Sequence, residues 1–166
     1  MEFLINKEYI LEKTLIGIIK DASKLKIAIQ HIDYFYVQKM LGYKLHKFLM
    51  EFHNQDASTI NPIILSSIQK QVYNLVRWYF ATMVHHQIII STIVKTNEKG
   101  TTQDTNTAHV ENVVAQEKYL LSTAEALKSD LLKLIINNPI QFQDLWDYSE
   151  VQPRSSYYSP VINFKK

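Results

Sequence analysis

Hydrophobic residues recur at steps of three and four along two long stretches of the chain. This spacing places them on one face of an α-helix. The first stretch begins at Asn61-Pro62, since Asn is a favoured N-cap and Pro suits the first helical position, and it ends near Asn97. Its apolar positions are Ile64, Ile68, Val72, Leu75, Val76, Tyr79, Met83, Ile90, Ile93 and Val94. The pattern predicts a helix of about 35 residues and about 50 Å, a length typical of bundles and coiled coils.

The second stretch follows a polar connection at residues 100–107 and runs from Ala108 to Ile136. Its apolar positions follow a heptad spacing; they are Val110, Val113, Leu120, Ala124, Leu127, Leu131 and Leu134. Glu117 falls on the same stripe, and we interpret it as a carboxylate at the stripe edge. Asn137-Asn138-Pro139 ends this helix and predicts a short one that continues through Trp146.

The first third of the chain is less regular. Two sets of apolar residues continue at helical steps as far as His53: Leu11, Leu15, Ile18, Ala22, Leu25, Ile29, Ile32 and Tyr36, then Leu41, Leu45, Phe48 and Phe52. Because residues 21–24 contain no Gly or Pro, the pattern favours one helix over 7–54 with a bend at 21–24, and two helices are the alternative. Residues 25–29 also alternate like a strand, but helical periodicity flanks them on both sides.

The scarcity of turn-forming residues supports the same fold class. With only three glycines and four prolines, the chain is suited to a few long elements rather than to many short strands. We therefore predict an all-α fold in which residues 1–150 form an antiparallel bundle of three to four long helices with a short C-terminal helix. Residues 151–166 contain two prolines and several aromatic residues, which predicts an extended tail that packs on its own bundle or on a partner.

The composition is that of an ordinary globular protein, with 46% hydrophobic and 20% charged residues and a net charge of +2. This balance does not indicate nucleic acid or an anionic membrane as a partner, and only Arg77 and Arg154 are arginines. The lack of cysteine excludes disulfides and thiolate chemistry and suits a reducing cytoplasm. Short apolar runs and the absence of a signal-peptide pattern complete the prediction of a soluble, cytoplasmic protein with no membrane association.

No pattern of catalytic, metal-binding or cofactor-binding residues is present. The chain has neither an HExxH nor an ExxH motif, and it has no GxSxG motif. Its glycines, Gly17, Gly42 and Gly100, are isolated and form no phosphate-binding loop. His46 and His53 share a helix face but lie about 10 Å apart, and His85 and His86 are adjacent, so that they point in different directions. We therefore predict no cofactor, no metal and no catalytic residue.

The most informative polar residues lie opposite the apolar stripe of the helix that begins at Asn61. Lys70, Asn74, Arg77, Trp78, Ala81 and His85 share this face by their spacing. A Trp beside an Arg is typical of protein interfaces, although a second helix of the same bundle could cover Trp78 instead. Tyr34, Tyr36 and Tyr43 around Phe35 add further amphipathic aromatic surface. The predicted partner-binding residues are Arg77, Trp78, His85, Tyr157, Tyr158 and Phe164.

These patterns favour a non-enzymatic protein that acts by interaction or assembly: a subunit, adaptor or chaperone-like component that binds protein partners and self-associates. The alternative is a helical-bundle enzyme or a ligand- or metal-binding protein. Its site would be assembled from side chains on separate helices, with His46, His53, His85 and Glu117 as the first candidates. The sequence alone does not exclude enzymatic activity.

Overall fold

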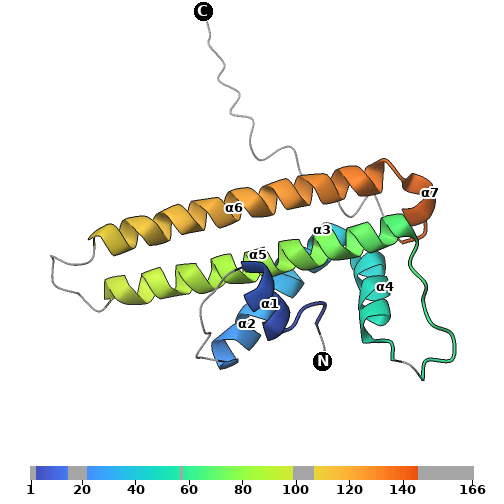
Figure 1. The fold of residues 1–166 in the computed structure, drawn as a ribbon, viewed down its shortest axis with the longest axis horizontal. Coiled ribbons are helices and arrows are strands. Elements are labelled where there is room, and N and C mark those ends of the chain that lie inside the picture. The colour runs from blue at the N-terminus through green and yellow to red at the C-terminus, as the bar shows by residue number, and fades with distance from the viewer. Residues whose placement is uncertain (1–2, 15–21, 57, 99–106, 146–166) are drawn as a thin grey trace, which may run out of the picture.

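The computed structural model describes residues 3–14, 22–56, 58–98 and 107–145, of which 22, 91–98 and 107–111 are described by their backbone alone. Helices account for every regular element in this part of the chain, which confirms the all-α class. Two long helices, α5 (Ser67–Glu98, 32 residues) and α6 (Thr107–Ile136, 30 residues), run antiparallel beside each other and share the largest interface in the molecule (Figure 1). None of the described helices is both long enough and apolar enough to cross a membrane.

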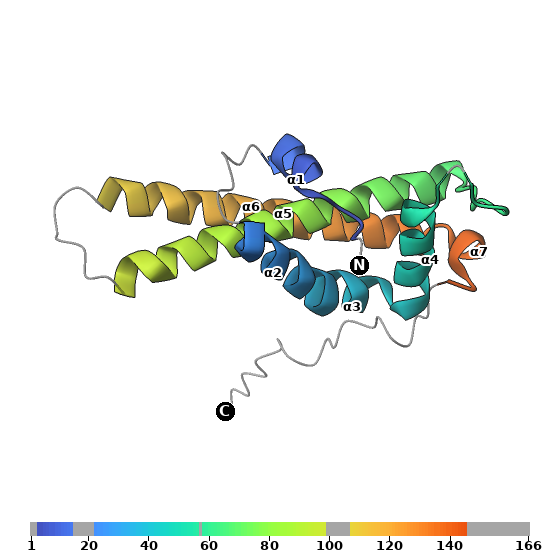
Figure 2. The ribbon, with the colours of Figure 1, turned by 90° about the horizontal axis from the view of Figure 1, so that it is seen from below.

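Shorter helices pack along one part of this hairpin. They are α1 (Lys7–Thr14), α2 (Ala22–Ile32), the π-helical turn η1 (Asp33–Val37), α3 (Gln38–Leu41), α4 (Tyr43–Asn54) and the single turn α7 (Pro139–Phe142). The helices α1 and α2 contact α5 from opposite sides (Figure 2). At the end of the hairpin where α5 begins, α4 runs across its direction and α7 lies close by (Figure 1). In both views the opposite end of the hairpin projects beyond the shorter helices.

The start of α5 differs from the prediction. The helix begins at Ser67, not at Asn61-Pro62, and Ile64 is 85% exposed instead of lying on the core stripe. Ser66 and Gln69 form a capping box, in which the Ser66 hydroxyl accepts from the Gln69 N–H (3.2 Å) and the Gln69 side chain accepts from the Ser66 N–H (3.0 Å). This exchange satisfies two backbone N–H groups that no helical carbonyl can reach.

The segment before α5 is held out of the helix by Gln55, which follows α4. The Gln55 side-chain amide accepts from the backbone N–H of Ile63 (2.8 Å) and donates to the backbone carbonyl of the same residue (3.1 Å). Both backbone groups of Ile63 are therefore engaged outside a helix. A contact made across eight residues overrides the favourable local preference of Asn61-Pro62 for a helix start.

The prediction of a single bent helix over residues 7–54 is wrong. The described part of α1 reaches Thr14, and residues 15–21 lie outside the described part of the chain. Of the expected bend at 21–24, residues 22–24 are helical and belong to α2. A break occurs at Gly42, between α3 and α4, where φ is 74° and ψ is 160°. This conformation is accessible to glycine because it lacks a Cβ atom, so the chain can change direction there while the Gly42 N–H still donates to the Gln38 carbonyl (2.9 Å).

The π turn explains a second departure from the predicted stripe. In η1 the Gln38 N–H donates to the carbonyl of Asp33, five residues earlier, so the turn contains one residue more than an α-helical turn. The buried stripe that reaches Ile32 therefore continues at Val37, and not at the predicted Tyr36. Val37 is completely buried, whereas Tyr36 lies on the surface.

The core is built where the shorter helices meet the hairpin. Its largest fully buried side chains are Phe80 on α5 and Phe142 on α7, and α6 contributes Leu131 and Ile135. Of the heptad positions predicted for α6, Leu120, Ala124, Leu127 and Leu131 are buried as expected. Among the described side chains, the last buried position of α5 is Val84 and the first buried position of α6 is Leu120.

The C-terminal predictions can be followed only as far as residue 145. The structure confirms a helix after Asn137-Asn138, but it is the single turn Pro139–Phe142. The predicted continuation of this helix is wrong for residues 143–145, which form a turn, while Trp146 and the predicted extended tail of residues 151–166 lie outside the described residues.

Candidate interaction surface at the π turn

Three consecutive aromatic residues of the π turn lie on the outside of the protein. Tyr34 is 61% exposed, Phe35 47% and Tyr36 40%. Large aromatic side chains are usually withdrawn from solvent because burying each of them stabilises a fold by about 2 kcal/mol. Three in a row on an outer face therefore require an explanation beyond folding. With Ile27, His31 and Lys39 they form what we call the aromatic surface.

The three rings of this surface are packed against one another, against His31 and against Lys39. The His31 ring lies 4.8 Å from the Phe35 ring and 6.0 Å from the Tyr36 ring, measured between centroids. Tyr34 meets Phe35 edge to face at 4.9 Å, and the Lys39 ammonium lies 5.3 Å from the Phe35 centroid. These contacts hold the rings in fixed positions, so that a partner would meet a preorganised surface.

A polar contact secures the base of the π turn. Asp33, its first residue, accepts a hydrogen bond at Oδ1 from the Nε2 atom of His46 on α4 (2.9 Å), and both side chains are largely withdrawn from solvent. This contact joins η1, which precedes the break at Gly42, to α4, which follows it. The π turn is thus held between the buried Val37 and the Asp33–His46 contact.

The predicted binding residue Arg77 is engaged within the protein. Its Nε–H donates to the backbone carbonyl of Leu4 (2.9 Å), and its guanidinium carbon lies 3.9 Å from the centre of the Tyr9 ring and 5.3 Å from that of Tyr73. A guanidinium between two aromatic rings gains cation–π attraction. Arg77 therefore attaches the N-terminal segment and α1 to α5.

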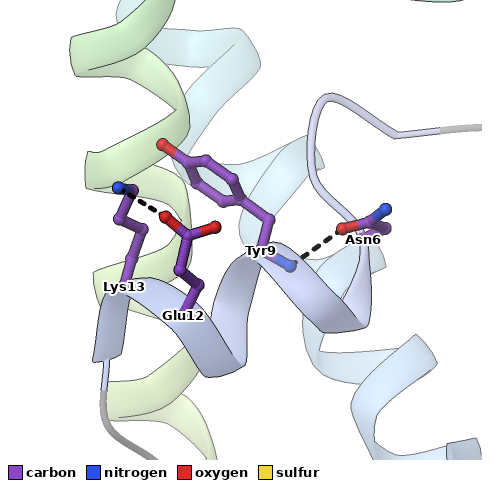
Figure 3. Close-up of polar contacts among 4 residues, drawn as sticks. All are labelled: Asn6, Tyr9, Glu12 and Lys13. Carbon is purple, nitrogen blue, oxygen red and sulfur yellow. Dashed lines mark hydrogen bonds and ion pairs between the residues drawn. The ribbon is translucent and has the colours of Figure 1, made fainter.

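The Tyr9 side chain extends from α1 towards α5 and lies beside Lys13 (Figure 3). The Tyr9 N–H donates to Oδ1 of Asn6 (2.9 Å), which caps the first turn of α1, and Lys13 pairs with Glu12 (2.9 Å). Burial raises the pKa of the Tyr9 hydroxyl, although the positive charges of Arg77 and Lys13 oppose this shift. The ring is thereby kept neutral beside the guanidinium.

The other residues predicted on the face of Arg77 do not share one environment. Trp78 is 44% exposed, and Lys70 and Asn74 are also on the surface, but Ala81 is fully buried and belongs to the core. Ala81 was therefore wrongly placed on the polar face, because α5 is covered on more than one side. His85 is half-buried, and burial, helped by neighbouring His86, lowers its pKa to about 4. Tyr157, Tyr158 and Phe164 lie outside the described residues.

The candidate histidines do not converge on one site. His46 contacts Asp33, the Nδ1 atom of His53 lies 2.6 Å from the Tyr73 hydroxyl, and Nε2 of His86 lies 3.6 Å from Oε1 of Glu117. Each of these contacts joins a different pair of elements. Within the described ranges no group of three or more histidines and carboxylates is placed to hold a metal ion.

The aromatic surface was only partly visible in the sequence. The run Tyr34-Phe35-Tyr36 stood out, but the helical period assigned Tyr36 to the core. A better signal is the five-residue step from Ile32 to Val37, since Val37 lines up with Met40 and Leu41 on the buried side. Only a structure with a π turn reconciles that step with a continuous helix.

The chain matches no protein-family model, no curated protein and no solved structure. The function has to be argued from the geometry of the chain itself.

Proposed function

We propose that this protein is a non-enzymatic interaction or assembly protein, a subunit, adaptor or chaperone-like component, which binds a protein partner through the aromatic surface. The observation that supports this role most directly is the exposure of Tyr34, Phe35 and Tyr36 on a π turn that still buries Val37. Insertions of this kind are found frequently at functional sites. Tyrosine and phenylalanine are also enriched at protein interfaces, and preorganised rings bind at a low entropic cost.

Self-association is the second part of the proposal, and it is supported by the projecting end of the hairpin. There α5 and α6 contact only each other among the described elements, and their side chains at 85–90 and 112–119 include the half-buried Ile89 and Val114. Two such ends from two copies would bury these side chains between four antiparallel helices. The predicted bundle of long helices would then be completed by the assembly, in the reducing cytoplasm that suits a cysteine-free chain.

Deletion of Phe35 provides a sharp test, because it removes the extra residue of the π turn. Val37 would then follow Ile32 at the four-residue spacing of an α-helix, so the core contacts should survive while the aromatic surface is reorganised. Partners would be purified from cells that make the protein, with three tagged forms as bait: the parent chain, the deletion variant and the control Ile60→Ser. The control alters an exposed side chain in the loop before α5.

We expect all three proteins to give the same far-ultraviolet circular dichroism and only the deletion variant to lose its stoichiometric partner. A tyrosine-retaining variant, Phe35→Ser, should weaken the same association without changing the length of the chain. If partner recovery is equal for all variants, the aromatic surface is not the binding site. If the purified protein instead turns over a substrate or carries a stoichiometric metal ion, the non-enzymatic role is wrong.

A further inference from the structure

We propose that the partner of the aromatic surface is an acidic amphipathic helix, which lies along the outer face of α2, η1 and α3. This inference rests on the proposed function and adds to it the chemistry of the partner. Three features of the outer face carry it: the sign of its charge, the spacing of its apolar side chains, and the way in which its rings are covered.

The charge of this face is positive. The exposed lysines Lys26 and Lys39 lie on α2 and α3, and the one acidic residue among residues 22–41 is Asp33. The Asp33 carboxylate is largely withdrawn from solvent and pairs with His46, so it does not offset the lysines on the outside. On α4 the exposed Lys44 adds a further positive charge beyond the break at Gly42. A chain with a net charge of only +2 thus concentrates positive charge around its exposed aromatic residues.

The apolar side chains on this face are spaced for a helical partner. Ile27, which is 65% exposed, and Tyr34 are seven residues apart, close to two helical turns, and Phe35 lies beside Tyr34. The opposite side of the same helix is already buried against the core through Leu25, Ile29 and Ile32. Two apolar groups two turns apart match the anchors that an amphipathic helix presents at positions i and i+7.

The covering of the rings favours a protein over a nucleic acid or a membrane. Lys39 lies over the face of Phe35, His31 packs against the same ring, and Tyr34 meets it edge to face. Stacking of bases requires free ring faces, and insertion among lipid chains requires apolar groups without an ammonium above them. The cations here are lysines, whereas phosphate groups are matched best by arginine. A partner carboxylate can instead pair with Lys39 or Lys26 while its apolar side chains pack on Ile27 and Phe35.

The test uses two defined probes, both fluorescein-labelled 18-residue peptides with leucine at the i, i+3, i+4 and i+7 positions of a helix. In one peptide the polar positions are glutamate and glutamine, and in the other lysine replaces every glutamate. Binding to the full chain would be measured by fluorescence anisotropy at two salt concentrations. Lys39→Glu, Lys26→Glu and Phe35→Ser are the test variants, and Lys133→Glu, an exposed lysine of α6, is the matched control.

We expect the acidic peptide to bind at least about tenfold more tightly than the basic peptide, and its affinity to fall as salt rises. Each of Lys39→Glu and Phe35→Ser should lower the affinity for the acidic peptide by about fivefold or more, whereas Lys133→Glu should leave this affinity unchanged. Equal binding of the two peptides would overturn the proposal. So would tighter binding of a 20-nucleotide single strand or of phosphatidylserine vesicles than of the acidic peptide.

This experiment separates the two proposals. If partner recovery from cells depends on Phe35 but the acidic peptide does not bind, only the assignment of an acidic helix is wrong. If neither partner recovery nor peptide binding responds to the loss of Phe35, the aromatic surface has no role in binding and both proposals fail.

Discussion

In the half of the α5–α6 hairpin that carries the other helices, many apolar side chains are fully buried, whereas in the other half none of the described apolar side chains is fully buried. We call these the proximal half, residues 67–84 and 120–136, and the distal half, residues 85–98 and 107–119, of which the structure describes the side chains of residues 85–90 and 112–119. Val72, Val76 and Phe80 of the proximal half have no exposed surface, while every described side chain of α5 from His85 to Ile90 keeps some. Both halves belong to the same two continuous helices.

The difference shows that an amphipathic helix pair does not bury its apolar residues without a third layer. Two packed helices cover one stripe of each other, and α5 in the proximal half is covered on further sides by α1 and α2. The stabilising hydrophobic contribution is therefore concentrated in the proximal half. The described apolar side chains of the distal half are the ones that the proposed self-association would bury.

The boundary between the halves is marked by two histidines. His85 and His86 follow directly after Val84, and His86 faces Glu117 of α6 at 3.6 Å. The Nδ1 atom of His85 and the Nε2 atom of His86 are buried and lack a hydrogen-bond partner among the described residues. Burying these nitrogens without a partner costs free energy, which adds to the difference between the two halves.

The largest expected effect is the loss of a proximal core side chain. Phe80→Ala removes a fully buried ring from the centre of α5 and should lower the free energy of unfolding by about 3–5 kcal/mol. Urea unfolding followed by circular dichroism would measure this loss. A change below about 1 kcal/mol would show that the proximal half is not the stabilising part of the hairpin.

A smaller loss of free energy of unfolding is expected when the contact between α1 and the proximal half is removed. Arg77→Ala removes the hydrogen bond to the Leu4 carbonyl and the contacts with Tyr9 and Tyr73, and should cost about 1–3 kcal/mol. Trp78→Ala, at the adjacent and more exposed position, is the matched control for the stability measurement. Hydrogen exchange of the α1 amides should accelerate in Arg77→Ala and stay unchanged in Trp78→Ala; equal rates in the two variants would contradict the role of Arg77.

Acidification should lower the free energy of unfolding through His85, which lies at the boundary between the halves. Because the pKa of His85 in the folded protein is about 4, below its ordinary value of 6.5, the unfolded chain binds the proton more readily between these values. The stabilisation is fully present above about pH 6.5 and is lost as pH falls towards 4, by about 1 kcal/mol once solvent screening of this half-exposed ring is allowed for. Unfolding curves at pH 7 and pH 5 should show the difference, and His85→Gln should reduce it; an unaltered pH dependence in that variant would assign the effect to other groups.

The smallest change in the free energy of unfolding is expected for a substitution in the distal half. Ile89 is half-buried and outside the cluster that packs around the core, so Ile89→Ala should change the free energy of unfolding by about 1 kcal/mol or less. The higher helix propensity of alanine offsets part of the loss. The proposed self-association supplies a second measurement. Light scattering of Ile89→Asp should show weaker association than the parent chain, and an unchanged mass would indicate that the distal halves do not meet.

Much of the helical structure could be predicted from the sequence because helical periodicity is a local property. The described part of α5 includes Asn97, where the pattern placed its end, and the described part of α6 covers the predicted range Ala108–Ile136. The core positions Leu120, Ala124, Leu127 and Leu131 followed from their spacing alone. A stripe repeated over eight turns leaves few alternatives for the buried face.

Three features were decided by tertiary structure. The start of α5 at Ser67 depends on Gln55, which binds the backbone of Ile63 eight residues away. The burial of Val37 in place of Tyr36 depends on a π turn whose Asp33 contacts His46 of another helix. The incomplete burial of Ile89 depends on how far α1 and α2 extend along α5. In each case the deciding contact joins residues that the helical period does not connect. The sequence by itself determined that the chain forms long amphipathic helices, because that follows from neighbours three and four residues apart. Only packing between helices could decide which apolar faces are covered and which, like the aromatic surface, remain open to a partner.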